Sequence, residues 1–266
     1  MANAHGDFIW YELMTTDADA AQAFYEGLVG WKFQRGGPDG MDYRMFGPGE
    51  RPELDGLMAL SQEMQDGGAR PVWTGYIGVN DVDATAARIA EAGAEILMEP
   101  QDIPDVGRFA FAKDPQGAPF YIMRGFSDED STAFALDGPK EGHCAWNELA
   151  TADREAAEGF YESVFGWEKG DSMDMGELGP YDMYRNPPHQ NMLGAIMGKR
   201  DEMPMSLWSY YFRIADIDAA ADYIRAKGGQ ILNGPMEIPG GEFVFNAMDP
   251  QGAMVSLLGP RINEKS

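Results

Sequence analysis

Residue types that commonly carry chemistry are scarce in this sequence. Cys144 is the one cysteine, which excludes an intramolecular disulfide, and there are three histidines. Cys144 falls in an apolar segment that we expect to form a strand, so we interpret it as a small buried residue. The nucleotide-binding motif G-x-x-x-x-G-K-[ST], the nucleophile motif G-x-S-x-G and the metal motifs CxxC and HExxH do not occur.

Positive charge and long apolar runs are also scarce. The chain has 20 Lys and Arg against 44 Asp and Glu, a net charge of −24, which argues against binding nucleic acid or an anionic membrane. No apolar run approaches the ~18 residues that a membrane-spanning helix requires, and no basic-then-apolar leader opens the chain. We therefore expect a soluble, cytoplasmic monomer or homodimer with a small molecule as its ligand.

The chain contains a long internal repeat. A Trp-x-Glu-Leu segment is followed by Phe-Tyr-Glu and then by Gly-Trp, and the whole order returns in the second half. The copies lie at residues 10–13, 24–26 and 30–31, and at residues 146–149, 160–162 and 166–167. A repeat of this length constrains the fold more than any single motif, so we interpret the sequence by its repeating units.

Each half reads as two units of strand, helix and three strands. Residues 8–13 are typical of a strand, Thr16 and Asp17 offer N-cap chemistry, and apolar residues recur with helical spacing over 21–28. The next unit starts near residue 73 and ends after an Asp-Pro-Gln-Gly turn at 114–117, which returns at 249–252. We predict an α+β protein with a first domain at 1–126 (units 6–62 and 71–126), a polar linker at 127–141 and a second domain at 142–266 (units 142–200 and 205–260).

Tandem βαβββ units with D-x-x-x-A-x-x-F-Y-x-x-x-x-G-W and a D-P-x-G turn resemble the vicinal oxygen chelate superfamily. That superfamily includes glyoxalase I, bleomycin-resistance proteins and extradiol dioxygenases, and the pattern here is most similar to its two-domain glyoxalase-like proteins. The resemblance covers nearly the whole chain, twice over. It implies that the four units pair into two cupped mixed β-sheets with the helices outside, and that the concave face of each sheet holds the ligand.

Enzymes of this superfamily usually bind a divalent metal through His, Glu or Gln, and the resemblance locates the ligand positions. In this sequence they are Trp10, Thr74 and Tyr121, then Trp146, Ser209 and Ser256. Transition metals and magnesium need imidazole, carboxylate or thiolate donors, which none of these side chains supplies. We therefore predict no cofactor, although a divalent metal bound by other residues stays open as an alternative.

Alternation along the strands predicts an aromatic pocket. If Trp10 points into the cup, Phe8 and Glu12 point there too, and Cys144 and Glu148 do the same beside Trp146. The predicted ligand-binding residues are Trp10, Thr74, Tyr76, Tyr121, Trp146, Ser209, Tyr211, Arg213 and Ser256. Such a composition is typical of a small-molecule site.

Glu12 and Glu148 are the candidate catalytic residues. A carboxylate enclosed by aromatic side chains has a raised pKa and can act as a general base, but each Glu could equally accept structural hydrogen bonds. Arg213 could pair with Glu148 or hold an anionic substrate. We interpret the Tyr-Arg pairs at 43–44 and 184–185 as sheet packing with the arginines pointing outward. We interpret the many methionines as core filler, with adaptable pocket lids or interface filler as alternatives.

Three functions follow from these residues. The first is a glyoxalase-like protein that binds a small, aromatic or apolar carbonyl-type molecule in a metal-free cup. The second is a lyase- or isomerase-type enzyme of the same superfamily, with Glu12 or Glu148 as base or with a metal bound elsewhere. The third is a non-catalytic homodimer that serves in interaction.

Overall fold

A computed structural model describes residues 3–37, 40–49, 52–187 and 189–262 of the 266-residue chain. The first half contains β1 (Phe8–Thr15), α1 (Ala18–Leu28), β2 (Trp31–Gly36), β3 (Tyr43–Pro48), β4 (Asp55–Ala59), α2 (Gln62–Asp66), β5 (Val72–Gly78), α3 (Val82–Glu91), β6 (Glu95–Ile103), β7 (Gly107–Lys113) and β8 (Pro119–Gly125). The second half contains β9 (Cys144–Thr151), α4 (Arg154–Phe165), β10 (Glu168–Asp174), the 3₁₀ turn Gly176–Leu178, β11 (Pro180–Arg185), β12 (Met192–Gly198), β13 (Leu207–Arg213), α5 (Ile217–Ala226), β14 (Gln230–Ile238), β15 (Glu242–Met248) and β16 (Met254–Gly259).

These elements form four βαβββ repeats, as predicted. We number them repeat 1 (β1–β4), repeat 2 (β5–β8), repeat 3 (β9–β12) and repeat 4 (β13–β16). Aspartates cap the four long helices. Asp17, Asp81, Asp153 and Asp216 each accept a hydrogen bond from the backbone amide of the third residue of the helix that follows. Within the described ranges, none of the helices has both the length and the hydropathy of a membrane-spanning segment.

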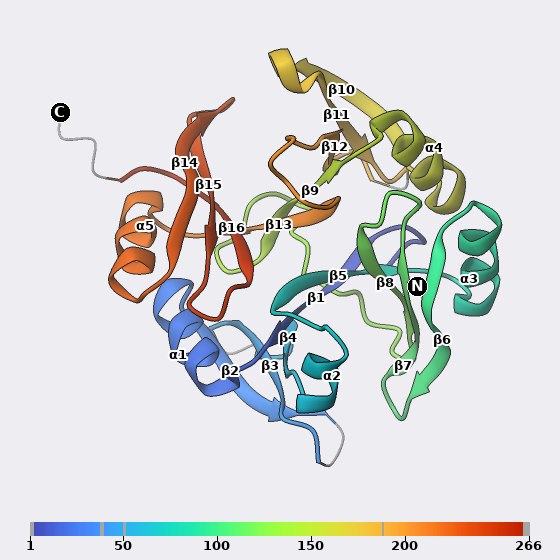
Figure 1. Cartoon of the computed structure of the whole chain (residues 1–266), viewed down its shortest axis with the longest axis horizontal. Helices are drawn as coiled ribbons and strands as arrows, with labels where there is room; N and C mark the ends of the chain where they lie inside the picture. Colours follow the sequence, from blue (N-terminus) through green and yellow to red (C-terminus); the bar gives the residue numbers. More distant parts are fainter. Residues whose placement is uncertain (1–2, 38–39, 50–51, 188, 263–266) are drawn as a thin grey trace. The chain divides into compact units, whose positions relative to one another are not determined.

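The strands form two eight-stranded mixed sheets. Their orders are β2-β3-β4-β1-β5-β8-β7-β6 and β10-β11-β12-β9-β13-β16-β15-β14. In each repeat the first and last strands run parallel, for example β9 with β12, and the long helix covers one face of the strands of its own repeat (Figure 1). The predicted α+β class is confirmed. We call the opposite face of each repeat its helix-free face.

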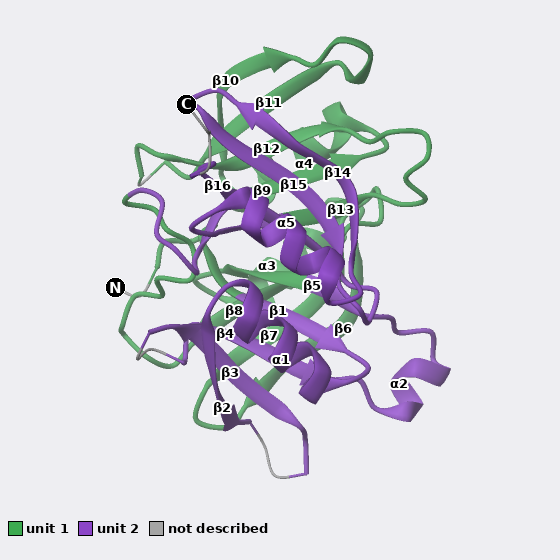
Figure 2. Cartoon of the chain, turned by 90° about the vertical axis from the view of Figure 1, so that its left-hand side faces the viewer, with its two compact units in different colours: residues 1–10, 74–137, 146–209 green, residues 11–73, 138–145, 210–266 purple. Residues whose placement is uncertain are grey.

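The described residues also group into two compact units (Figure 2). Unit 1 comprises residues 1–10, 74–137 and 146–209, and unit 2 comprises residues 11–73, 138–145 and 210–266. Each unit therefore combines one repeat from each half of the chain: repeats 2 and 3 in unit 1, repeats 1 and 4 in unit 2. The predicted domains 1–126 and 142–266 follow the two sheets along the sequence, and they stay a prediction.

A buried hydrogen-bond chain joins the two repeats of unit 1. Tyr161, the tyrosine of the Phe-Tyr motif on α4, donates through its hydroxyl to Asp114 Oδ2 at 3.1 Å and accepts from Trp208 Nε1 at 2.9 Å. Asp114 also accepts from the backbone amides of Gln116 and Ala118 in its Asp-Pro-Gln-Gly turn. Burial raises the pKa of Asp114, which these hydrogen bonds partly oppose. The helix of repeat 3 therefore binds the turn of repeat 2.

Unit 2 contains the same chain with its members drawn from the other repeats. Tyr25 on α1 donates to Asp249 Oδ2 at 3.0 Å and accepts from Trp73 Nε1 at 3.1 Å. The tryptophans of the Gly-Trp motifs add one bond each: Trp31 Nε1 donates to the carbonyl of Gly142 at 2.8 Å, and Trp167 Nε1 donates to that of Gly6 at 2.9 Å. The family motifs thus join repeats from opposite halves.

We predict that Tyr161→Phe lowers the free energy of unfolding by about 1–3 kcal/mol, because the buried Asp114 and Trp208 groups lose their partner. Tyr25→Phe should have a similar effect in unit 2. Urea unfolding followed by tryptophan fluorescence measures both. Tyr223→Phe is the control, since the described residues offer its hydroxyl no hydrogen bond. Equal stability of the Tyr161→Phe and Tyr223→Phe proteins would contradict the prediction.

Candidate functional site

The strand register of repeat 3 shows which side chains share its helix-free face. Asp182 on β11 forms ion pairs with Arg154 of α4, so its side chain lies on the helix side. Its neighbours Tyr181 and Met183 therefore lie on the helix-free face. Met183 is the cross-strand partner of Ala195, which in turn is the partner of Glu148, so Glu148 shares that face.

Three side chains on this face form a hydrogen-bond chain. Trp146 Nε1 donates to Tyr181 Oη at 2.7 Å, and Tyr181 Oη donates to Glu148 Oε2 at 2.9 Å. Trp146 and Glu148 are half-buried, whereas Tyr181 is buried. The structure therefore brings the predicted Trp146 and Glu148 together through a tyrosine that sequence reasoning missed.

A sequence signal for that tyrosine exists in the Tyr-x-Met segments at 43–45 and 181–183. In repeat 1, Met45 pairs with Gly56 and Gly56 with Glu12, so Tyr43 occupies the place of Tyr181 and Glu12 that of Glu148. Glu12 is buried. The signal is visible only once the register is known, because the sequence alone aligns Tyr43 with Tyr184.

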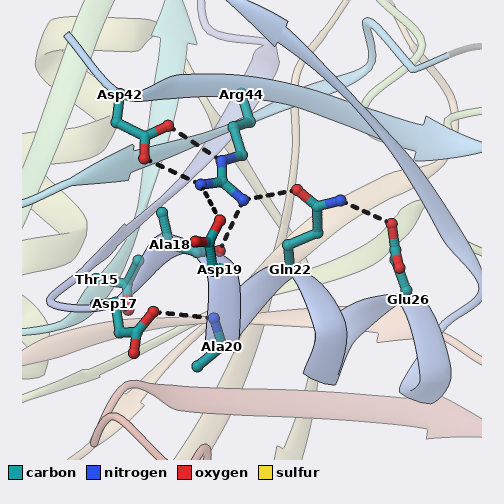
Figure 3. Close-up of polar contacts among 9 residues, drawn as sticks. All are labelled: Thr15, Asp17, Ala18, Asp19, Ala20, Gln22, Glu26, Asp42 and Arg44. Atoms are coloured by element: carbon teal, nitrogen blue, oxygen red, sulfur yellow. Dashed lines mark hydrogen bonds and ion pairs between the residues drawn. The ribbon is translucent and has the colours of Figure 1, made fainter.

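The same alignment pairs Arg44 with Arg185 and predicts that both point outward. For Arg44 this prediction is wrong. Its side chain is buried, and its five N–H groups meet five acceptors (Figure 3). Nε and Nη2 bond Asp42 at 3.1 and 3.0 Å, Nη2 also bonds Asp19 at 2.6 Å, and Nη1 bonds Gln22 at 2.7 Å and the carbonyl of Ala18 at 3.2 Å. Arg44 points inward because α1 places three hydrogen-bond acceptors, on Ala18, Asp19 and Gln22, next to it.

A polar hollow of about 300 Å³ opens beside Arg44. It is lined by Asp19, Gln22, Phe33, Gln34, Arg35 and Arg44. A site for an anion would need spare donors, and the guanidinium of Arg44 has none left. We therefore assign Arg44 to packing between α1 and β3, and we look for the ligand on the helix-free faces.

Repeat 3 carries the same network with its charges reversed. The register places Asp182 at the position of Arg44, and its partners are Arg154 of α4 and Lys169, whose Nζ lies 2.9 Å from Asp182 Oδ2. Burial raises the pKa of Asp182, but hydrogen bonds and the positive charge of Lys169 together lower it to about 2. Arg185 lies elsewhere, on the surface, paired with Glu168.

A side chain of β4, rather than the strand ladder, binds the backbone of β1 at Tyr11. The backbone amide of Tyr11 donates to the side chain of Asp55 at 2.7 Å, and pairing between β1 and β4 begins only at Glu12. Residues 8–10 of β1 belong to unit 1 and residues 11–15 to unit 2, so Phe8 and Glu12 lie in different units. Phe8 packs in the core of unit 1, where its ring lies 5.4 Å from that of Trp208. The prediction that Phe8 shares a face with the pocket residues is therefore wrong.

Cys144 does not line the pocket either. It is fully buried and contacts the hydroxyl of Tyr11, whose side chain lies on the face opposite to that of its neighbour Glu12. The prediction that Cys144 is a small buried residue is confirmed, and the prediction that it points into the cup is wrong.

Repeat 2 contributes an aromatic stack in unit 1. Tyr76 and Tyr121 are cross-strand partners whose rings stack at 4.3 Å with 9° between their planes, and Phe111 stacks on the other side of Tyr121 at 4.3 Å. Thr74, which is 1 % exposed, has a hydroxyl without a hydrogen-bond partner among the described residues. The predicted residues of this repeat thus form an aromatic wall beside an orphaned hydroxyl.

In repeat 4 the predicted residues are tied to neighbouring strands. Asn246 Nδ2 donates to Ser256 Oγ at 2.6 Å and lies 3.4 Å from Tyr211 Oη. Arg213 forms a bidentate pair with Glu242, at 2.7 and 2.6 Å, in place of the possible pair with Glu148. Asn246 and Glu242 went unnoticed in the sequence because both belong to β15, which has no counterpart in the metal-ligand pattern.

The superfamily's metal does not fit these positions. The six positions hold two tryptophans, a tyrosine, two serines and a threonine, and none of them offers an imidazole or a carboxylate. Within the described residues no three His, Cys, Asp or Glu side chains are grouped so that they could hold a metal ion. The expectation of a metal-free pocket stays a prediction.

Comparison with known proteins establishes the family. The model of the Glyoxalase/Bleomycin resistance protein/Dioxygenase superfamily matches residues 8–122 and again residues 141–257. The chain belongs to this superfamily. A protein named "Putative glyoxylase CFP32" from Mycobacterium tuberculosis is 33 % identical over an alignment of 263 positions, which covers 94 % of each chain. The anthracycline biosynthesis protein DauV from Streptomyces sp. (strain C5) is 28 % identical over 96 % of this chain and 94 % of its own.

Solved structures of the superfamily share the fold. The Mn(II)-bound glyoxalase from Novosphingobium aromaticivorans has a TM-score of 0.63 and 18 % identity, covering 97 % of this chain and 83 % of its own. The 2,3-dioxygenase LapB from Pseudomonas sp. KL28 has a TM-score of 0.64 and 11 % identity, covering 98 % and 94 %. The predicted membership of the vicinal oxygen chelate group is confirmed.

The buried Asp55 generates a prediction about pH. Burial raises its pKa well above the usual value, because Oδ2 has no partner among the described residues and only the amide of Tyr11 opposes the shift. A raised folded-state pKa stabilises the protein below the unfolded value of about 3.9, and this stability is lost as the pH rises through the folded pKa. Asp55→Asn keeps the bond to Tyr11 and cannot ionise. Its stability relative to the wild type should therefore increase from pH 4 to pH 8 in urea unfolding; a constant difference would contradict this.

Proposed function

We propose that this protein binds a small, aromatic or apolar carbonyl compound on the helix-free faces of its sheets, without a metal at the superfamily's usual positions. The observation that carries the proposal is the Trp146–Tyr181–Glu148 chain. It presents a half-buried indole, a phenol and a carboxylate on one face of repeat 3. Trp146 occupies a position at which enzymes of the superfamily have a metal ligand.

The chemistry of these groups favours a flat ligand with a polar edge. Indole and phenol rings offer large rigid surfaces for stacking, and few polar groups then fix the orientation of the ligand. Glu148 can accept a hydrogen bond from a phenolic or enolic hydroxyl of the ligand. In repeat 2 the orphaned hydroxyl of Thr74 supports a polar contact as well, since buried hydroxyls normally have a partner.

The names of two relatives support the same ligand class. One is named a glyoxylase, and another is named for anthracycline biosynthesis; anthracyclines contain fused aromatic rings with quinone carbonyls. We therefore choose 1,4-dihydroxyanthraquinone as the first probe. Cyclohexanone, which has a carbonyl group but no aromatic ring, is its control.

Tryptophan fluorescence tests the proposal directly. Four of the six tryptophans are at most 4 % exposed, whereas Trp10 and Trp146 are half-buried. We expect the quinone to quench the emission saturably and cyclohexanone to leave it unchanged. Trp146→Phe should remove most of the quenching if the ligand binds repeat 3, and Trp10→Phe should do so if the ligand binds repeat 1. Saturable binding that neither variant weakens would contradict the proposal, as would failure to bind both the quinone and a single-ring aromatic ketone such as acetophenone.

The position of Glu148 also favours a second function, a metal-independent enzyme with this carboxylate as general base. The hydrogen bond from Tyr181 orients the carboxylate, as a base requires. Such an enzyme would exchange a benzylic proton next to the carbonyl of a benzyl ketone such as phenylacetone for deuterium from the solvent.

The variant Glu148→Gln tests whether the Glu148 carboxylate acts as a base or only stabilises the structure. Glu12→Gln is the matched variant in repeat 1. A base predicts loss of exchange by about a hundredfold or more with little change in melting temperature. A lower melting temperature together with unchanged exchange per folded molecule would instead assign the residue to structure. NMR of the ketone and thermal unfolding supply the two measurements.

A further inference from the structure

Methionines surround Tyr181 on the helix-free face of repeat 3. Its cross-strand partners are Met197 on β12 and Met173 on β10, and Met183 follows two residues later on the same strand. Directly opposite residues of antiparallel strands have Cβ atoms about 4.5–5.5 Å apart, so the three thioethers and the phenol form one continuous surface.

Repeat 1 has the same arrangement around Tyr43. Its cross-strand partner is Met58, whose own partner on β1 is Met14, and Met45 follows two residues after Tyr43. A Cβ added to Gly36 would lie 2.8 Å from the terminal methyl of Met45, so the Met45 side chain extends over the residue paired with Tyr43. Met45 corresponds to Met183, and Met58 corresponds to Met197.

The exposure of these methionines argues against a role as core filler. Met14 is buried, but the other five are half-buried on a face that no helix covers. Thioethers are polarisable, have three rotatable bonds, and make favourable contacts with aromatic rings at about 5 Å. A surface of methionines around a tyrosine can therefore adapt to the outline of a flat ring system.

We propose that the two methionine pairs, Met183 with Met197 and Met45 with Met58, determine the selectivity of the protein for polycyclic over single-ring aromatic ligands. This inference rests on the proposed function, and it adds the residues that contact the outer rings of a wide ligand. A single ring is in contact with the tyrosine and tryptophan alone, whereas a fused tricyclic system extends over the neighbouring thioethers.

Calorimetry with two probes tests the proposal on the full chain. The probes are 1,4-dihydroxyanthraquinone, with three fused rings, and acetophenone, with one. The variants are M183L/M197L, the matched M45L/M58L, and the control M64L/M205L, in which both methionines are exposed. Leucine conserves the volume and removes the sulfur and part of the flexibility, so folding should be retained.

We expect M183L/M197L or M45L/M58L, or both, to weaken binding of the quinone about threefold to tenfold and binding of acetophenone less than twofold, on the scale of sulfur–aromatic contacts. The control should match the wild type. Quinone binding that neither pair alters overturns the inference and leaves the proposed function intact, as does wild-type protein that binds acetophenone but not the quinone. Failure of the wild type to bind either probe overturns both.

Discussion

The structure depends on one buried contact made twice: a tyrosine hydroxyl that donates to the aspartate of an Asp-Pro-Gln-Gly turn and accepts from a tryptophan. In unit 1 it is Tyr161 with Asp114, and in unit 2 it is Tyr25 with Asp249. Each aspartate also holds the amides of its own turn. Each contact connects a helix from one half of the chain to a turn from the other. Loss of the hydroxyl would leave buried polar groups without partners, which is costly in a dry interior.

The sequence motifs therefore divide between structure and function. The Phe-Tyr, Gly-Trp and Asp-Pro-Gln-Gly segments stabilise the pairing of repeats within each unit. The Trp-x-Glu-Leu segment supplies the polar and aromatic groups of the helix-free face. Because the scaffold is stabilised elsewhere, the site residues are free to vary among members of a superfamily that performs many reactions on one fold.

The charged networks show how duplicated repeats keep geometry while changing charge. Arg44 on β3 and Asp182 on β11 occupy the same place in repeats 1 and 3, and each meets opposite charges from the adjacent helix. A comparison of the two copies by residue type alone misses this equivalence. Here the register, which follows the backbone, identifies the correct partners.

The fold could be predicted from the sequence because its signals are local and repeated: aspartate caps, helical spacing over 21–28, and turns at fixed places. That Trp146 and Glu148 share one face was also predictable, since they lie two apart on a strand. Tyr181, Asp55 and the partner of Arg213 were not predictable, because each depends on which strand lies beside which and in what register. The hydrogen bond from the Tyr11 amide to Asp55, for example, joins residues 44 apart in the sequence.

The central claim is that the superfamily's metal site has been replaced in this chain by an aromatic surface with a carboxylate. Elemental analysis of the purified full-length protein, prepared without chelators from cells supplied with manganese, iron, nickel and zinc, tests it most directly. The account predicts far less than one metal ion per chain after gel filtration. One tightly bound transition-metal ion per chain, retained through gel filtration, would contradict it.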